Sequence, residues 1–289
     1  MEITKKDFDG QQWLLDQPLT VTVAGNVIDI SQSRQPSGKV PVMWLDSDTY
    51  VDTRSGEVLE CQHSQHRGEA MSIPELRRTF KRMRGLINSN FFGDENELFI
   101  TLTYAENMQD VQRLQYDLQK FMSKVKRALG EIKYLSAVEP QQRGAWHAHL
   151  LVKQMTAHRT YWPAEEIAEA WQHGFVHVQR LEDCDNVGAY LSAYLSNVPE
   201  VDQQQRPLQD VPKKVIKGAR LHWYKKGTHI YRASQNLERP IVKKIRPYSS
   251  EHRRIMNCRL CYSRQLDLSD SDTGKSINQI LQAQFNIKK

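Results

Sequence analysis

Between residues 97 and 197 the hydrophobic period of the sequence alternates, and this order of segments limits the folds open to the chain. Short apolar or alternating runs predict strands, and apolar residues spaced three and four apart predict helices. The predicted order is strand, helix, strand, strand, helix, strand, and then one more helix. The segments are 98–104, 111–129, 131–139, 146–153, 163–174, 175–179 and 187–197. The first six match the βαββαβ unit of ferredoxin-like folds.

We therefore predict an α+β fold with a ferredoxin-like βαββαβ core. Its helices would cover one face of a central antiparallel sheet, and the other face would remain free for a ligand. Strands one and three normally occupy the centre of such a sheet, so segment 146–153 is expected there. We assign residues 71–200 to this core domain, residues 1–70 to a small β-rich extension, and residues 201–289 to a basic C-terminal segment.

Turn and cap residues predict further elements outside the βαββαβ unit. They are a strand–turn–strand over 19–30, a hairpin over 40–61, a helix from Ser72 to Asn90, a hairpin over 219–232 and a short helix over 277–285. The basic face of the helix that Ser72 caps carries Arg77, Arg78, Lys81, Arg82 and Arg84. Such a face is either solvated surface or a contact for phosphates.

Composition limits the class of protein. The chain has 289 residues, of which 39% are hydrophobic and 26% are charged, as in soluble globular proteins. No apolar run approaches the roughly 20 residues of a membrane span, and residues 1–5 do not resemble a signal peptide. Four cysteines in a chain of this size are typical of a reducing compartment. We expect a cytoplasmic protein that does not associate with membranes.

Positive charge is concentrated near the C-terminus. The stretch 213–264 contains fifteen lysines and arginines but only two glutamates, a balance of +13. Because the whole chain carries +6, the remainder carries about −7. A basic segment on an acidic body favours a polyanionic partner, most often nucleic acid, over a merely solvated tail.

The most unusual strand is Trp146–Val152, which carries two histidines. On a strand, His147 and His149 point to the same face. Glu139 ends the preceding strand, and a tight connection would bring it beside one of them. Two imidazoles and a carboxylate with open coordination positions describe a catalytic metal site for Zn²⁺, Mn²⁺ or Fe²⁺, and less readily Mg²⁺. The alternative is that Glu139 is an ordinary carboxylate at a strand end.

The last predicted helix contains two tyrosines on one face. Tyr190 and Tyr194 are four residues apart, so both phenols point in the same direction. Taken alone, they are packing aromatics. Near a metal and nucleic acid they become candidate nucleophiles, because a divalent ion favours the phenolate of a group whose ordinary pKa is about 10.

Other potential ligands are weaker candidates. His177 lies on the predicted strand beside the histidine strand. Cys258 and Cys261, with His252, suggest zinc, but a full set of four ligands at zinc-site spacing is missing.

Three motifs resemble those of the HUH endonuclease superfamily, in particular rolling-circle replication initiators of plasmids and single-stranded DNA phages. Phe99–Tyr104 is similar to their first motif. Glu139–His149 resembles the acidic residue plus the paired-histidine motif, and Asn186–Leu195 resembles the tyrosine motif in its two-tyrosine form. The motifs occur in the family order over about 100 residues.

The resemblance implies a site and a reaction. His147, His149 and Glu139 would hold Mg²⁺ or Mn²⁺ against a scissile phosphate of single-stranded origin DNA. Tyr190 or Tyr194 would attack that phosphate, forming a 5′-phosphotyrosine and a 3′-OH for a polymerase. A second transfer would reseal the strand without ATP. A host helicase and a DNA polymerase are the implied partners.

The chain departs from the family pattern at two points. Ala148 is small where a bulky residue is usual, and Ala193 and Asn197 replace lysines that often follow the tyrosines by three residues. We expect other cations to stabilise the phosphate, and the candidates are Arg143, Lys213, Lys214, Lys217, Arg220, Lys225 and Lys226.

Three other functions fit parts of this pattern. A conjugative relaxase or a transposase would use the same chemistry, but relaxases typically place the tyrosine ahead of the histidines. A sequence-specific DNA-binding protein without cleavage would need neither the histidine pair nor Glu139. A metal hydrolase unrelated to DNA would not need the basic segment.

Overall fold

A computed structural model describes most of the chain. The described residues are 2–6, 8–10, 12–34, 42–46, 49–52, 56–60, 73–141, 144–181, 187–188, 198–199, 215–216, 223–269, 274 and 276–288. The chain forms two compact units. One comprises Met1–Val23, Val27–His66 and Ile241–Lys289, and the other comprises Ala24–Asn26 and Arg67–Pro240.

The second unit contains the predicted ferredoxin-like core. Its βαββαβ elements are β7 (Glu97–Thr103), α2 (Val111–Leu129), β8 (Ile132–Pro140), β9 (Trp146–Gln154), α3 (Ala164–Trp171) and β10 (Val176–Gln179). The strand order is β10-β7-β9-β8-β13, where β13 is Tyr231–Ala233, and every neighbouring pair is antiparallel. The predicted α+β class is confirmed, and the histidine strand β9 lies at the centre of the sheet.

Local signals explain the bounds of α2. The Asp110 side chain accepts hydrogen bonds from the backbone N–H groups of Gln112 and Arg113, which caps the first turn. At the other end, Gly130 has a φ of 72° and its N–H donates to the Lys126 carbonyl. The apolar stripe between the two caps is buried in the main core.

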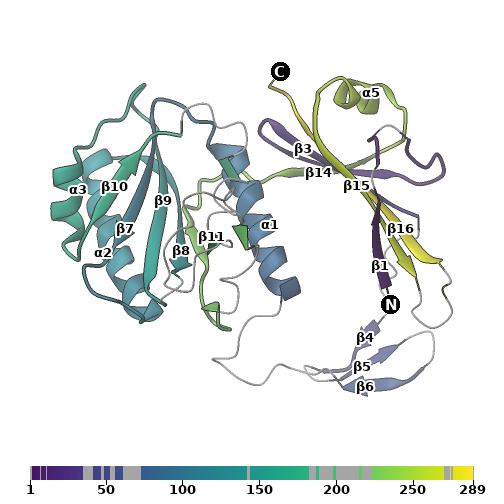
Figure 1. Ribbon diagram of the computed structural model, residues 1–289, viewed down its shortest axis with the longest axis horizontal. Helices are drawn as coiled ribbons and strands as arrows, with labels where there is room; N and C mark the ends of the chain where they lie inside the picture. The colour runs from purple at the N-terminus through teal and green to yellow at the C-terminus, as the bar shows by residue number, and fades with distance from the viewer. Residues whose placement is uncertain are drawn as a thin grey trace. The chain divides into compact units, whose positions relative to one another are not determined.

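Helices lie on both faces of this sheet, which corrects the prediction of one free face. Figure 1 shows α2 and α3 on one side of the sheet and α1 (Ile73–Asn90) on the other. Met83 and Ile87 of α1 line a small pocket together with Phe99 and His149. The sheet exposes an apolar surface here, and the amphipathic helix α1 buries its own apolar stripe against it.

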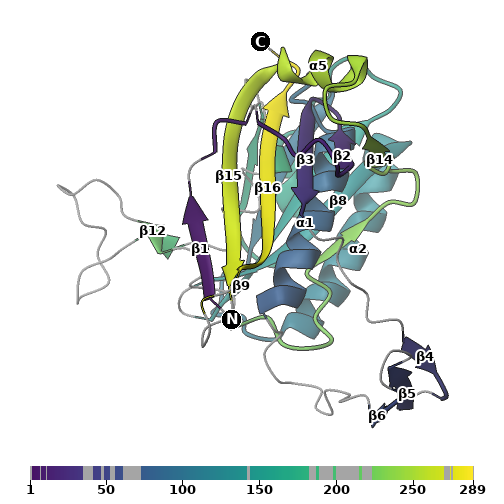
Figure 2. The same ribbon diagram turned by 90° about the vertical axis from the view of Figure 1, so that its right-hand side faces the viewer.

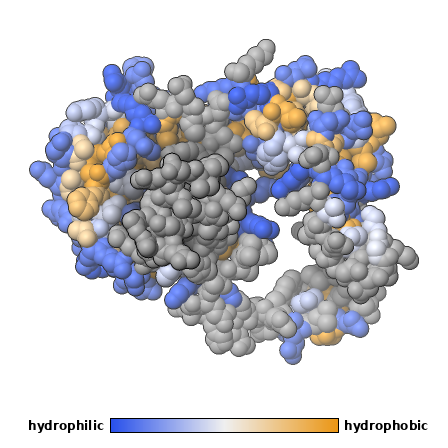
Figure 3. Space-filling model, in the orientation of Figure 1, coloured by the Kyte–Doolittle hydropathy of each residue, from blue (hydrophilic) through white to orange (hydrophobic). Residues whose placement is uncertain are grey.

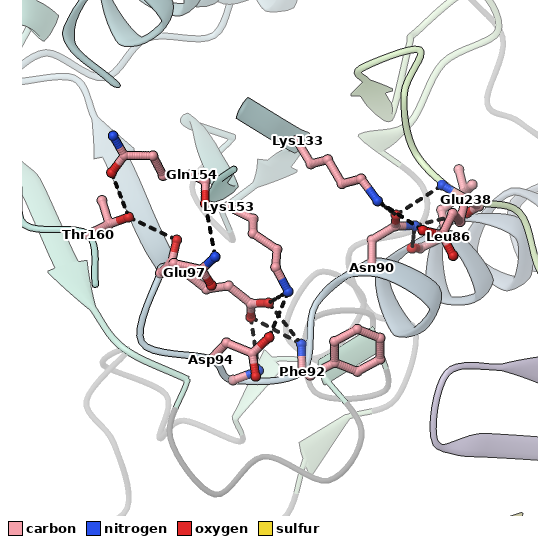
Figure 4. A network of polar contacts seen from close by, with 12 residues as sticks. Leu86, Asn90, Phe92, Asp94, Glu97, Lys133, Lys153, Gln154, Thr160 and Glu238 are labelled. Atoms are coloured by element: carbon pink, nitrogen blue, oxygen red, sulfur yellow. Dashed lines mark hydrogen bonds and ion pairs between the residues drawn. The ribbon is translucent and has the colours of Figure 1, made fainter. Parts of the chain in front are cut away.

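Polar contacts fix the end of the sheet farthest from His147. The Lys153 ammonium lies 2.7 Å from Asp94 and 3.0 Å from Glu97, whose carboxylate also accepts from the Phe92 and Gly93 backbone (Figure 4). Glu97 is buried, so Lys153 compensates a charge that would otherwise be expensive to bury. This network holds the starting end of β7 against the final residues of β9.

The predicted hairpin over 219–232 is wrong in its pairing. Tyr231–Ala233 forms β13, which pairs with β8 in the register Tyr231↔Ala137. The rest of this unit includes the short strands β11 (Val198–Pro199) and β12 (Val215–Ile216), which pair with each other.

The first unit contains a six-stranded antiparallel sheet and the helix α5 (Ser250–Met256). The strand order is β1-β15-β16-β3-β2-β14. These strands are β1 (Glu2–Lys6), β2 (Leu19–Ala24), β3 (Val27–Ser33), β14 (Ile241–Ile245), β15 (Arg259–Ser269) and β16 (Ser276–Asn286). A small separate sheet contains β4 (Val42–Trp44), β5 (Thr49–Asp52) and β6 (Val58–Glu60), in place of the predicted two-stranded hairpin.

Strand β16 corrects the predicted helix over 277–285. Its apolar residues include Ile280, Leu281 and Phe285, whose spacing is compatible with a helix. In the folded chain β16 pairs with β15 on one side and β3 on the other, which buries Leu281, Ala283 and Phe285 on one face. Long-range pairing therefore overrides the local pattern. N- and C-terminal strands share this sheet, so the division differs from the three consecutive segments expected from the sequence.

The described surface is largely hydrophilic on the face drawn in Figure 3, with smaller apolar patches. Among the described residues, no helix has the length and apolar character that a membrane crossing requires. Figure 2 gives a second view of the two units, in which the long strands β15 and β16 lie side by side.

Candidate active site

Strand register brings the predicted ligands to one face of the sheet. Glu139 of β8 lies directly opposite His147 of β9, and Ala137 lies opposite His149. On the other side of β9, Thr101 of β7 is the partner of His149. The predicted tight connection is present, since Pro140 pairs with Trp146. His147, His149 and Glu139 therefore share a face, as the alternation of side chains requires.

His149 and Glu139 form a buried pair. The side chains are 2% and 3% exposed, and Glu139 Oε2 contacts His149 Nε2. The Thr101 hydroxyl lies 3.1 Å from His149 Nδ1, and the Phe99 ring stacks on the imidazole with centroids 5.5 Å apart. Because Nε2 and Oε2 point at each other, a proton or a cation must lie between them.

The surroundings of His149 suit a metal ligand. Burial lowers the pKa of His149 to about 4, so the imidazole is neutral near neutral pH. When Nδ1–H donates to the Thr101 hydroxyl, the Nε2 lone pair points toward Glu139 and is available to a metal. A hydrogen bond to the second ring nitrogen commonly fixes ligating histidines in this way.

His147 completes the donor set less directly. Its Nδ1 lies 3.3 Å from Gln141 Nε2, and the residue is half-buried. Among the described residues, no three histidine, cysteine, aspartate or glutamate side chains are arranged to hold a metal ion. Residues directly opposite on antiparallel strands have Cβ atoms about 5 Å apart, so a turn of the His147 ring would bring it toward Glu139. The donor types therefore fit a divalent metal, and two of the three already converge.

The neutral His149 predicts a specific pH dependence of stability. Unfolded histidine takes up a proton near pH 6.5, whereas His149 in the folded chain does so only near pH 4. Between these values the unfolded state binds more protons, so stability is expected to fall as the pH falls, by up to about 1.4 kcal/mol per pH unit.

Urea unfolding at pH 7, 6 and 5, in the presence of a chelator, measures this effect. The wild-type chain should lose stability more steeply than the His149→Gln variant, because glutamine does not titrate. Equal slopes in the two proteins would show that His149 does not remain neutral.

The tyrosine segment begins against α1. Tyr190 and Tyr194 lie outside the described residues, but Val187 and Gly188 are described. Val187 is 2% exposed in the main core, and the Gly188 N–H donates to Asn88 Oδ1 at 2.8 Å. A Cβ on Gly188 would lie 2.7 Å from the Arg84 carbonyl oxygen. Glycine therefore permits a close approach to the helix that covers the histidine face.

Gly188→Ala is expected to destabilise the chain by about 1–3 kcal/mol, because the new methyl group meets backbone rather than a flexible side chain. Thermal unfolding measures the loss. The matched control is Gly227→Ala at a position with open space around the Cβ but a φ of 89°, which reports backbone strain without a clash. A Gly188→Ala loss no larger than that control would contradict the close packing.

The remaining predicted phosphate contacts are only partly described. Lys225 is exposed and Lys226 is half-buried, both in the loop before β13. The others lie outside the described residues, namely Arg143, Lys213, Lys214, Lys217 and Arg220. The connection that contains Arg143 ends at Gly144, whose φ is 85° and whose position meets the Trp223 ring.

Several other polar residues are held away from this pair. His177 is exposed on β10 and pairs with Thr101, so β7 separates it from His149. The Tyr104 hydroxyl donates to Asp117 at 2.7 Å, and burial together with this bond raises the pKa of the phenol. Tyr104 is therefore a structural residue.

The possible zinc ligands belong to the other unit. His252 Nδ1 accepts from the Tyr248 backbone N–H at 2.9 Å. The thiols of Cys258 and Cys261 instead face the carbonyls of Arg254 and Arg259. Both cysteines are free. The described side chains of this unit form no zinc-binding group.

Sequence reasoning missed the residues that support the pair. Thr101 and Phe99 flank His149, and Gly188 allows the approach to α1. The alternation in β7 places Phe99 and Thr101 on one face, but only the pairing of β7 with β9 shows that this face is the histidine face.

The fold and this site define a ferredoxin-like domain with a buried histidine–carboxylate pair on its central strand. Residues 97–199 match the model of the replication-associated protein ORF2 family, which covers about a third of the chain. This similarity is consistent with a rolling-circle replication initiator. Neither the curated proteins nor the solved structures compared with the chain gave a match.

Proposed function

We propose that the chain is a rolling-circle replication initiator that nicks single-stranded DNA at an origin. The observation that carries this proposal is the buried contact between Glu139 and His149 on the central strands. It lies within the stretch that matches a replication-associated family. A carboxylate buried against a neutral imidazole suits metal-assisted chemistry better than simple scaffolding.

His147, His149 and Glu139 are the residues that would hold Mg²⁺ or Mn²⁺. The metal would supply a Lewis acid that polarises the scissile phosphate. Thr101 would orient His149 by accepting from Nδ1–H, and Phe99 would keep water from the imidazole by stacking on it.

The nucleophile in this proposal is Tyr190 or Tyr194. Its phenolic oxygen forms a bond to phosphorus as the bond from phosphorus to the 3′ oxygen of the preceding nucleotide breaks. The phenol loses one proton and the departing 3′ oxygen gains one, so the exchange of two ester bonds balances. The 5′ end remains on the tyrosine, and the 3′-OH is free for a DNA polymerase.

Retention of an ester bond explains how the strand is rejoined without ATP. A 3′-OH attacks the phosphotyrosine in the reverse exchange. With two tyrosines, one holds the first 5′ end while the second cuts at the end of a replication cycle. A helicase would unwind the duplex ahead of the growing strand.

A relaxase or transposase with the same chemistry is the second candidate. In this sequence the tyrosines follow the histidines by about forty residues, whereas typical relaxases place the tyrosine first. The chain order therefore favours replication over transfer.

Incubation of the chain with single-stranded DNA from its own element's origin tests the proposal. In Mg²⁺ or Mn²⁺, a protein–DNA species that survives denaturant is expected, and a chelator should prevent it. A chain that binds these origins but gives no such species would support a non-catalytic DNA-binding protein instead.

A further inference from the structure

Helix α1 carries five exposed cations within eight residues. They are Arg77, Arg78, Lys81, Arg82 and Arg84. None of them makes an ion pair or a side-chain hydrogen bond with any residue that the structure describes. Two pairs, Arg77 with Lys81 and Arg78 with Arg82, are like charges four residues apart, an arrangement that destabilises a helix by a few tenths of a kcal/mol.

The cations of α2 behave differently. Arg113 forms an ion pair with Glu106 at 2.9 Å, and the Lys124 ammonium donates to the Ala170 carbonyl at 2.7 Å. Lys120 and Lys126 lie over the rings of Tyr116 and Tyr134. Most basic residues on α2 therefore have a partner within the fold, whereas the row on α1 is left facing solvent.

The position of α1 connects this row to the candidate active site. Its buried residues Met83 and Ile87 line the same pocket as His149. Phe80 packs edge-on against Tyr224, whose hydroxyl donates to the carbonyl of Val138, the residue before Glu139.

The same helix also meets the tyrosine segment, because Gly188 rests on the backbone at Arg84. Helix α1 thus contacts both the surroundings of the histidine pair and the chain that leads into the two tyrosines.

We propose that this row on α1, which we call the α1 cation row, binds the backbone phosphates of the single-stranded DNA that enters the site. The proposal rests on the proposed nickase function for its substrate. The row spans about 10 Å of helix, at a rise of 1.5 Å per residue. Arginine and lysine on phosphates position a strand without reading its sequence. Recognition of the origin would then depend on other residues.

The salt dependence of DNA binding separates this row from general positive charge. Each phosphate contact to a single strand contributes about 0.7 to the slope of log K against log salt. The variant Arg77→Gln/Lys81→Gln should therefore reduce the slope by about 1.4. Its affinity at 50 mM salt should fall on the order of tenfold to a hundredfold.

The matched control is Lys120→Gln/Arg127→Gln, which removes two exposed cations from α2 on the opposite face of the sheet. Binding of a fluorescent single strand is measured by anisotropy between 50 and 200 mM salt, with a chelator present so that no cleavage occurs. The control should keep the wild-type slope and affinity. Thermal unfolding should give the same midpoint for both variants, because all four side chains are exposed.

An unchanged slope in the α1 variant, or the same loss in both variants, would overturn the α1 cation row. The result is independent of cleavage. If the α1 variant alone loses slope while the wild-type chain forms no covalent species on any origin, the DNA surface stands and the nickase proposal fails. If the covalent species forms but the α1 slope is unchanged, the nickase proposal stands and the cation row fails.

Discussion

His149→Gln is expected to reduce covalent adduct formation on the order of a thousandfold. His149 is the most buried of the three proposed ligands, and its Nε2 already contacts Glu139. Glutamine keeps a polar group near Glu139 but removes the imidazole donor. The loss of a metal ligand that polarises the phosphate would raise the barrier by about 4 kcal/mol, which is the stated rate factor. Single-turnover rates of adduct formation in Mn²⁺ measure the change.

The matched control is His177→Gln. His177 pairs with Thr101 on the adjacent strand, so it lies on the same face as His149, but it is exposed and separated from it by β7. This variant should keep the wild-type rate. Thr101→Val should fall between the two, with a loss of about 10- to 100-fold, because only the orientation of His149 changes.

Circular dichroism shows whether each of these variants is folded. A folded His149→Gln chain that forms the adduct at the wild-type rate would remove His149 from the proposed ligand set.

The double variant Tyr190→Phe/Tyr194→Phe is expected to form no adduct above background. Phenylalanine preserves the ring and its packing but lacks the oxygen that must bond to phosphorus. Each single variant should retain a measurable rate if either phenol can attack, and the ratio of the two rates assigns the first nucleophile. Denaturing gels with end-labelled DNA separate adduct from free strand.

The control for this variant is Tyr161→Phe, which alters a tyrosine of the same unit that is 81% exposed. It should leave adduct formation unchanged. DNA binding by the double variant should also match the wild-type chain, because the hydroxyl groups are needed for chemistry and not for phosphate contacts. An adduct in the double variant would mean that another residue is the nucleophile.

Local sequence signals were sufficient for the core of the second unit. The caps Asp110 and Gly130 fixed α2, and the alternation of period fixed β7, β8 and β9. The known strand order of the ferredoxin-like fold then placed the histidines at mid-sheet. The meeting of Glu139 with the histidine strand followed from one short connection.

The features that the sequence did not reveal depend on long-range packing. Strand β16 has a spacing of apolar residues that also suits a helix, and only its two neighbours decide the outcome. Helix α1 was predicted as a basic amphipathic helix, but nothing in its own residues says which face of which sheet it covers. That choice places Met83 beside His149 and Gly188 beside Arg84.

The central claim is that a tyrosine of this chain becomes linked to the 5′ end of nicked DNA. The direct test is mass spectrometry of the adduct after nuclease and protease digestion. The account predicts a nucleotide phosphate on the peptide that contains Tyr190 and Tyr194, formed with Mg²⁺ or Mn²⁺ and missing from samples treated with chelator. A phosphate on another residue, or cleaved DNA with free 5′ ends and no linked peptide, would contradict it.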